Sequence, residues 1–518
     1  MLVKTFGSAV YGIDATTITI EVNVTEGLHT FVVGLADSAV KESIQRVESS
    51  IKSSGYFMPR TKLVVNLAPA GIRKSGSAFD LPIALGVLAA SGQLPDPGIL
   101  KDYVIMGELG LDGSIHPIKG ALPIAAQARR EAFKGLIVPQ QNAGEAAIVK
   151  ELRVYSFRHI REVIQFFHDT GSLDPVLPRA DADRFSPQEF FDLDFSEVKG
   201  QEPIKRALEI AAAGGHNAIM IGPPGSGKTM LAKRLPTILP PLNLQEALET
   251  TKIHSVAGKL PANGGLITRR PFRSPHHTVS GTALAGGGSI PQPGEISLAH
   301  NGVLFLDELP EFSRSVLETM RQPMEDRKVT ISRARMSVDF PSGFILLASM
   351  NPCPCGYHNH PQKECTCPPG LVQKYLHKIS GPLLDRIDLH VEVVPVPYSE
   401  LSDARDSESS ATIRQRVIAA RNLQSRRYAA YTGISDHPIH CNAQMSNRLL
   451  REFCVIDIAG EKLLRGSMEG LQLSARAYER ILKVSRTIAD LAGSGSIMPA
   501  HLAEAIQYRS LDRTEWGG

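Results

Sequence analysis

The chain has 518 residues, of which 42% are hydrophobic and 21% are charged, and its formal net charge at pH 7 is +3. This is the composition of an ordinary globular protein of about three domains. The small net charge excludes a protein that binds nucleic acid through its overall charge, so a surface that binds nucleic acid would have to be a local cluster of basic residues. No apolar run is long enough to span a membrane, and six cysteines in so long a chain do not form a disulfide scaffold, so we expect a cytoplasmic protein with no membrane partner.

Residues 1–170 have the pattern of a domain that mixes strands with helices. Alternating apolar residues predict a strand at 17–24, and helical spacing predicts a helix at 38–53. The Asp-Gly pair at 112–113 lies between two apolar segments and is typical of a hairpin turn. Residues 171–192 contain Pro, Asp and Ser without a clear period, and we interpret them as a linker.

Residues 193–400 alternate strands with helices, and residues 401–518 have mainly helical spacing. This predicts an α/β multidomain protein with a parallel-sheet core and a helical C-terminal domain. The core contains Gly-Pro-Pro-Gly-Ser-Gly-Lys-Thr at 222–229, between an apolar strand at 218–221 and a helix. Glycines let backbone N–H groups surround a phosphate, and the helix N-terminus adds a favourable dipole. The run is therefore predicted to be a P-loop, the phosphate-binding loop of many nucleotide-hydrolysing proteins.

Each residue of this loop is predicted to contact ATP. Lys228 would reach the β- and γ-phosphates, and the hydroxyl of Thr229 would bind Mg²⁺. The full set is Gly222, Pro223, Pro224, Gly225, Ser226, Gly227, Lys228 and Thr229.

Polar residues also end two further apolar strands. Asp307 and Glu308 follow the run at 303–306. Asp307 would hold Mg²⁺ through its water shell, and Glu308 would orient and polarise the attacking water. Asn351 ends the run at 344–350 and would hydrogen-bond the γ-phosphate or the water. The alternatives are a solvated acidic strand end and an asparagine that only forms a turn.

Two arginines are candidates for neutralising charge on the γ-phosphate, a role that a neighbouring subunit often supplies. Arg386 is one, although it could equally form a salt bridge with Asp385 or Asp388. Arg476, at the start of a predicted helix over 475–491, is the other. The residues alone leave both roles open.

Four of the six cysteines form two Cys-x-Cys pairs. Four thiolates suit a tetrahedral Zn²⁺ ion, which would be structural because it leaves no open coordination position. His358 and His360 lie between the pairs and could replace a thiolate, and free thiols in a reducing cell are the alternative. The predicted zinc ligands are Cys353, Cys355, Cys365 and Cys367.

The order of these motifs resembles that of the AAA+ ATPases. The matching residues are Val198-Lys-Gly200-Gln201, the P-loop, Asp307-Glu308, Asn351, Asp385-Arg386 and Ser474-Ala-Arg476. Longer stretches at 270–278, 294–302 and 350–355 narrow the resemblance to the magnesium-chelatase-like ATPases of the ComM (YifB) type. The similarity extends over essentially the whole chain.

The resemblance implies a hexameric ATPase that moves on DNA and promotes branch migration during homologous recombination in natural transformation. It implies that Val198 and Gly200 lie beside the nucleotide. It also implies that Arg386 is the arginine finger and that Arg476 is the sensor-2 arginine of a helical lid. The DNA partner would be single-stranded or branched and bound without regard to sequence.

Residues 1–170 resemble the Lon protease domain, whose fold is that of a ribosomal-protein-S5-like family and whose chemistry uses a Ser–Lys dyad. The matching run at 74–80 puts Ala78 at the serine position, and the run at 116–122 puts Leu122 at the lysine position. Alanine offers no nucleophile and leucine offers no base. The resemblance therefore implies a catalytically inactive domain that serves as a scaffold or DNA-binding ring.

Two segments of the core are candidates for contact with DNA phosphates. Residues 328–340 alternate like a hairpin and lie where related DNA motors carry a pore hairpin. Residues 259–273 are a second basic insertion, whose glycines suit a flexible loop. The candidates are Arg333, Arg335, Lys259, Arg270 and Arg273. A solvated hairpin tip is the alternative.

Two other functions are compatible with the sequence. A magnesium-chelatase-type remodelling ATPase would have the same core, but it would need a partner that inserts metal into a porphyrin. An ATP-dependent protease is disfavoured by Ala78 and Leu122.

Overall fold

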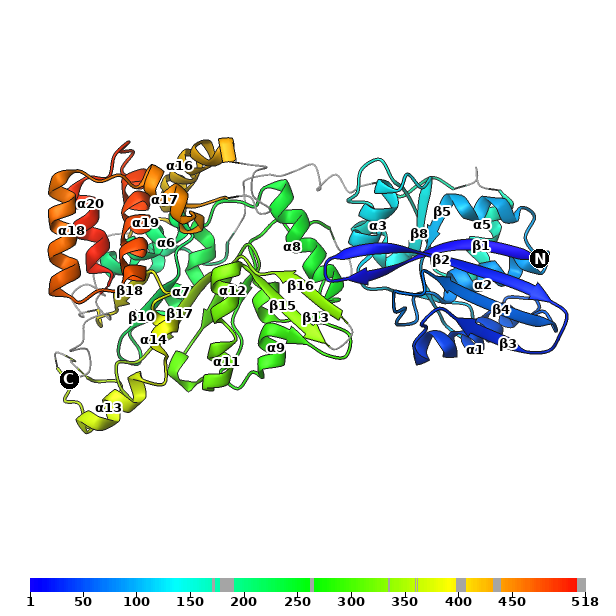
Figure 1. Ribbon diagram of the computed structural model, residues 1–518, viewed down its shortest axis with the longest axis horizontal. Helices are drawn as coiled ribbons and strands as arrows, with labels where there is room; N and C mark the ends of the chain where they lie inside the picture. Colours follow the sequence, from blue (N-terminus) through cyan, green and yellow to red (C-terminus); the bar gives the residue numbers. More distant parts are fainter. Residues whose placement is uncertain are drawn as a thin grey trace. The chain divides into compact units, whose positions relative to one another are not determined.

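The structure is a computed structural model that describes residues 1–169, 173–177, 191–260, 265–333, 336–358, 360, 362–396, 407–431 and 439–509. The chain divides into two compact units, whose elements are labelled in Figure 1. The first unit consists of Met1–Ser186 with Leu244–Thr268, and the second consists of Pro187–Asn243 with Arg269–Gly518. Residues 244–268, which the sequence predicts to be part of the core domain, are therefore grouped with the N-terminal unit.

The first unit is built on a seven-stranded mixed sheet in the order β3-β4-β2-β1-β5-β8-β9. Along β2 the side chains of Ile18, Ile20 and Val22 are fully buried and alternate with more exposed neighbours, which confirms the strand predicted at 17–24. The strands are β1 (Leu2–Tyr11), β2 (Asp14–Thr25), β3 (Thr30–Val33), β4 (Lys62–Ala68), β5 (Tyr103–Ile105), β8 (Gly135–Pro139) and β9 (Arg153–Phe157).

The helices of the first unit pack on this sheet. The helix predicted at 38–53 is confirmed as α1, and it begins where the side chain of Asp37 accepts a hydrogen bond from the backbone N–H of Val40 (2.9 Å). The predicted turn at 112–113 is confirmed between two short antiparallel strands, β6 (Glu108–Leu109) and β7 (Ile115–His116). The principal helices are α1 (Ser38–Ser53), α2 (Asp80–Ala90), α3 (Ala121–Arg130) and α5 (Ile160–His168).

Helix α8 (Leu244–Val256) also belongs to this unit, because it packs against α3. The backbone carbonyl of Ser255 accepts a hydrogen bond from the N–H of Gly120 (3.3 Å), and the Ser255 hydroxyl donates to the buried carboxylate of Glu145. Near the middle of α8, the ammonium of Lys252 lies 3.6 Å from the carboxylate of Asp14. These contacts join residues that are far apart in the sequence.

The second unit is built on a five-stranded parallel sheet in the order β11-β14-β17-β10-β18. The central strands are buried throughout and, apart from Ser349 in β17, apolar, as expected for parallel strands that are covered on both faces. The strands are β10 (Ala218–Ile221), β11 (Phe272–Arg273), β14 (Val303–Leu306), β17 (Ile345–Met350) and β18 (Leu389–Glu392). The parallel α/β core predicted from the sequence is thus confirmed.

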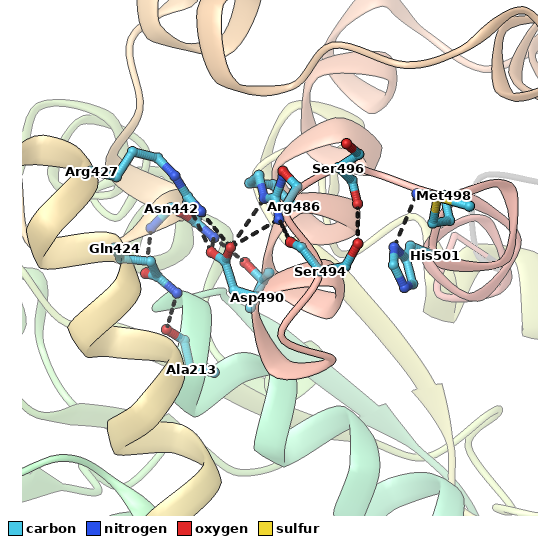
Figure 2. A network of polar contacts seen from close by, with 12 residues as sticks. Ala213, Gln424, Arg427, Asn442, Arg486, Asp490, Ser494, Ser496, Met498 and His501 are labelled. Atoms are coloured by element: carbon cyan, nitrogen blue, oxygen red, sulfur yellow. Dashed lines mark hydrogen bonds and ion pairs between the residues drawn. The ribbon is translucent and has the colours of Figure 1, made fainter.

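Helices at the C-terminal end share one apolar core with this sheet. A buried polar network, drawn in Figure 2, holds them together. The carboxylate of Asp490 accepts hydrogen bonds from Arg427, Arg486 and Asn442, and Gln424 donates to the carbonyl of Ala213 (3.1 Å). The C-terminal helices are α16 (Ser410–Tyr428), α17 (Asn447–Phe453), α18 (Ile458–Gly470), α19 (Ala475–Leu491) and α20 (Pro499–Gln507). Helix α6 (Glu202–Gly214), which precedes β10 in the chain, packs against α16 and α19 in the same core.

Candidate functional site

The predicted phosphate-binding loop joins strand β10 to helix α7 (Lys228–Ile238) in the second unit. Gly227 caps this helix with a φ of 89°, a left-handed conformation that glycine adopts without strain. The strand–loop–helix arrangement aims the first N–H groups of α7 toward the loop, where the helix dipole favours an anion.

Lys228 is the first residue of α7, and its side chain reaches back over the loop. Its ammonium donates to the carbonyl oxygens of Gly222 (2.7 Å) and Pro223 (2.9 Å) and to the side-chain oxygen of Asn351 (3.2 Å). Asn351 follows β17, the strand next to β10, so the parallel sheet brings two distant sequence positions to the same edge. Burial lowers the pKa of Lys228, and the carboxylates of Asp307 and Glu308 oppose that shift.

Asp307 receives hydrogen bonds from three directions. The hydroxyl of Thr229 donates to one carboxylate oxygen (2.8 Å), and the backbone N–H of Glu308 donates to the other (3.1 Å). The hydroxyl of Ser349 also donates to this second oxygen. Carboxylate and hydroxyl oxygens are the hard ligands that Mg²⁺ prefers, so Thr229 and Asp307 fit a magnesium site by their chemistry.

Ser349 was not predicted from the sequence. It is a fully buried polar residue in the otherwise apolar strand β17, and this strand lies between β14 and β10. A polar residue inside such a run is the signal that could have identified it. Its position lets it fix the orientation of Asp307.

Glu308 adopts a left-handed conformation (φ of 53°) and has an exposed side chain. Its carboxylate lies 3.7 Å from Nδ1 of His277, whose ring lies against that of His276 with centroids 4.0 Å apart. The structure brings His277 to the predicted water-activating residue, a proximity that comparison of the two separate segments in the sequence does not reveal.

The segment that contains Val198 and Gly200 reaches the same edge of the sheet. The side chain of Gln201 donates to the carbonyl of Val394 (2.8 Å), just beyond the end of β18, and Val198 is buried. Strands β10 and β18 pair in parallel from Ala218 and Leu389 onward, so their ends lie together. Gln201, the residue after Gly200, therefore reaches the end of the sheet at which the phosphate-binding loop begins, whereas a contact of Val198 or Gly200 with the nucleotide stays a prediction.

Arg386 lies at the opposite edge of the sheet. Its backbone carbonyl accepts a hydrogen bond from the side chain of Asn217 (3.2 Å), which precedes β10, whereas the phosphate-binding loop follows β10. Because β10 has four residues, it spans about 13 Å between Asn217 at its start and the phosphate-binding loop at its end. The guanidinium of Arg386 is buried, contacting Glu325 (2.5 Å) and the carbonyl of Pro382 (2.5 Å).

Arg476 lies on the same side of the second unit as Arg386, and not beside Lys228. Its guanidinium lies 3.7 Å from the carboxylate of Asp385, the residue before Arg386, and more than half of its side chain is exposed. Asp388, in contrast, is paired with Arg480 (3.0 Å). The two predicted arginines thus share one edge of the second unit.

The predicted DNA-contact residues have different surroundings. The hairpin expected at 328–340 is confirmed as β15 (Lys328–Arg333) and β16 (Met336–Pro341), with Arg333 exposed near its tip and Arg335 outside the described residues. Lys259 belongs to the first unit. Arg273 forms a two-bond contact with Glu295 (2.6 and 2.8 Å).

Arg270 is likewise occupied within its own unit. It donates to the carbonyl oxygens of Pro240 (2.6 Å) and Asn301 (2.7 Å). Arginines that satisfy buried carbonyl or carboxylate groups are less available for phosphates.

The four cysteines predicted to bind zinc lie together, with their sulfur atoms all within 4.8 Å of one another. All four are free thiols. The loop that carries them begins two residues after Asn351.

In the first unit, the positions that match a protease dyad are apolar. Ala78 packs against an apolar cluster, and Leu122 is buried. The nearby Ser77 donates to the carboxylate of Glu108, and the ammonium of Lys74 donates to the carbonyl of Gly34 (3.0 Å). The polar groups near these positions are thus engaged in other contacts.

Comparison with known proteins gives consistent matches along the chain. Family models described as "Subunit ChlI of Mg-chelatase", "Magnesium chelatase, subunit ChlI" and "Magnesium chelatase, subunit ChlI C-terminal" match residues 20–142, 194–401 and 407–509.

Within the part of the chain that the structure describes, no helix is long and apolar enough to span a membrane.

Three relatives illustrate the range of similarity. The uncharacterized protein YifB of Salmonella typhimurium is 44% identical over 511 residues, which cover 98% of this chain and 96% of the relative. The competence protein ComM of Haemophilus influenzae is 42% identical over 512 residues, covering 98% and 97%. Lon protease 2 of Bacillus subtilis is 33% identical over 157 residues, covering 28% of this chain and 27% of the protease.

Proposed function

The chain belongs to the magnesium-chelatase-like AAA+ ATPases of the ComM (YifB) family, and from this premise we propose that it is a ring-forming ATPase that moves on DNA and promotes branch migration during natural transformation. The observation that carries the proposal is the separation of the charged groups. Lys228 and Asp307 gather at one edge of the parallel sheet, and Arg386 lies at the other.

We assign each residue at the carboxyl edge a role in ATP hydrolysis. The loop N–H groups and Lys228 bind the phosphates, while Thr229 and Asp307 hold Mg²⁺, which supplies charge neutralisation when it is bound. Glu308 takes a proton from the attacking water, and Asn351 orients that water or the γ-phosphate. Ser349 keeps the Asp307 carboxylate in position.

A neighbouring subunit completes the site in this proposal. Arg386 is separated from its own loop by the length of β10, so it serves the ATP of an adjacent chain, together with the exposed Arg476. To do so Arg386 exchanges its contact with Glu325 for the γ-phosphate. A closed ring gives every ATP such a partner, and we propose a hexamer.

The proposed DNA contacts centre on the β15–β16 hairpin. The exposed Arg333 and its near neighbour Arg335 can grip phosphates without reading bases, which suits single-stranded and branched DNA of any sequence. Lys259 is a further candidate. Arg270 and Arg273 are better explained by their internal contacts.

The rate of ATP hydrolysis with a four-way DNA junction, with single-stranded DNA and without DNA tests this proposal. We expect branched DNA to stimulate hydrolysis. Replacing both Arg333 and Arg335 by alanine is expected to lower the ratio of stimulated to unstimulated rate, whereas Lys328→Ala at the base of the same hairpin, which pairs with Asp339, is the matched control. A rate that DNA leaves unchanged contradicts the proposal.

The family descriptions favour one second candidate, a magnesium-chelatase-type remodelling ATPase. Its rate of ATP hydrolysis would change in the presence of a protein that inserts metal into a porphyrin and would be the same with and without DNA. The same assay, run with such a protein in place of DNA, distinguishes the two candidates.

A further inference from the structure

We propose that Cys353, Cys355, Cys365 and Cys367 bind one Zn²⁺ ion and that the loop closed by this ion braces the phosphate-binding loop. The zinc site itself is independent of the proposed function. The bracing role rests on the loop at 222–229 binding a nucleotide.

The sulfur positions match a tetrahedral ion. The Sγ atom of Cys353 lies 3.3 Å from that of Cys355 and 3.7 Å from that of Cys365, and the last two are 3.6 Å apart. Four sulfurs about 2.3 Å from a central zinc are separated by about 3.8 Å. A disulfide needs about 2.05 Å, so the cluster has the spacing of ligands and not of cystines.

The backbone around the cluster also suits thiolates. The N–H of Cys355 donates to the sulfur of Cys367 (3.4 Å), and the N–H of His358 donates to the sulfur of Cys353 (3.3 Å). Such bonds orient sulfur ligands around a metal. Four thiolates at these distances would repel one another unless a cation lay between them. The metal centres that a tetrahedral set of four sulfurs selects are zinc and iron–sulfur centres.

The loop touches the phosphate-binding loop through Gly356. A Cβ atom at Gly356 would lie 2.5 Å from Cδ of Pro224, so only glycine fits against this proline, and its φ of 85° also requires glycine. The N–H of Gly356 donates to the carbonyl of Cys353 (3.0 Å), which fixes this turn to a metal ligand. Cys353 in turn follows Asn351, the partner of Lys228.

One ion would therefore hold two parts of the nucleotide site. Fixing Cys353 and Cys355 fixes Gly356 against Pro224 and limits the movement of Asn351 beside Lys228. Since four thiolates leave no open position, the ion would not take part in hydrolysis. Loss of zinc or oxidation of the thiols would loosen the site without removing any residue that contacts ATP.

Zinc content tests the first half of the proposal. The full chain, purified under reducing conditions and dialysed against metal-free buffer, is analysed for all transition metals by mass spectrometry. We expect about one zinc ion per chain, lost in Cys365→Ala and Cys367→Ala and retained in Cys441→Ala, which removes a buried cysteine outside the cluster. A chain without zinc, with iron instead, or with equal zinc in all variants overturns the site.

A measurement on the unaltered chain guards against variants that fail to fold. Titration with a thiol-blocking mercurial in the presence of a zinc-sensitive dye is expected to release zinc as the cluster thiols react. Thiols that react without release of zinc overturn the proposal.

Binding of a fluorescent ATP analogue tests the bracing role. Gly356→Ala is expected to keep its zinc but to bind the analogue about tenfold more weakly. The matched control is Gly370→Ala, because a Cβ at Gly370 would have no neighbour within 4 Å. Equal affinity in both variants overturns the brace. Failure of the unaltered chain to bind the analogue would instead count against the proposed function and leave the zinc site standing.

Discussion

The ammonium of Lys228 lies 3.2 Å from the side-chain oxygen of Asn351. The two residues are distant in the sequence but follow the neighbouring strands β10 and β17, so the parallel sheet sets their separation. A buried ammonium needs partners, and here it has an amide oxygen and two carbonyl oxygens. Phosphate oxygens of ATP can replace these partners, which makes this pair the centre of the proposed site.

Lys228 and Glu308 are predicted to separate binding from hydrolysis. Lys228→Ala is expected to weaken binding of ATP about a hundredfold, because a hydrogen bond to a charged group contributes about 1.5–3 kcal/mol. Glu308→Gln keeps the shape of the side chain but removes the base, so it is expected to bind ATP and stop turnover. Equilibrium binding and phosphate release are measured on each variant.

The exposed Lys233, on the same helix as Lys228, provides the control for the loss of a positive charge. Lys233→Ala is expected to leave both binding and turnover unchanged. Hydrolysis at the normal rate in Lys228→Ala or Glu308→Gln would refute the assigned roles.

Ser349→Ala is predicted to affect magnesium more than ATP. The Ser349 hydroxyl holds the carboxylate of Asp307, and loss of such a supporting contact typically weakens a metal site about tenfold. The concentration of Mg²⁺ that gives half-maximal hydrolysis is expected to rise, while ATP binding in the presence of EDTA stays the same. An unchanged magnesium requirement would show that Ser349 only packs the strand.

Arg386→Ala is predicted to bind ATP but to hydrolyse it about a thousandfold more slowly. The decisive test mixes this variant with Lys228→Ala, which is also inactive. In mixed rings an intact loop from one variant meets an intact arginine from the other at about a quarter of the interfaces, so activity returns. Mixtures that stay inactive would contradict a shared site, provided that the two variants are shown to assemble together.

The buried network of Figure 2 is predicted to stabilise the C-terminal helices. Asp490→Ala leaves the guanidinium groups of Arg427 and Arg486 without their carboxylate, and breaking a buried ion pair costs about 3–5 kcal/mol. Thermal unfolding followed by circular dichroism is expected to begin at a lower temperature. Glu461→Ala, which breaks an exposed pair with Arg465, is the control and is expected to change stability by about 1 kcal/mol or less.

Local patterns in the sequence predicted the elements that depend on neighbouring residues. The strand in β2, helix α1, the hairpin of β15 and β16 and the context of the phosphate-binding loop all follow from periodicity or turn chemistry.

Features that depend on contacts between distant segments could not be predicted from local patterns in the sequence. The grouping of residues 244–268 with the first unit rests on contacts such as Ser255 with Gly120. Ser349 and His277 acquire their partners only when separate segments meet. The sequence offered Asp385 and Asp388 as salt-bridge partners of Arg386. In the structure Arg386 pairs instead with Glu325, which is distant in the sequence.

The proposed motor activity is tested most directly by conversion of a labelled four-way DNA junction into duplex products by the purified chain. With ATP and Mg²⁺ we expect products to accumulate, and with Glu308→Gln or without ATP we expect the junction to persist. An enzyme that hydrolyses ATP in the presence of the junction but never converts it would contradict a DNA motor that drives branch migration.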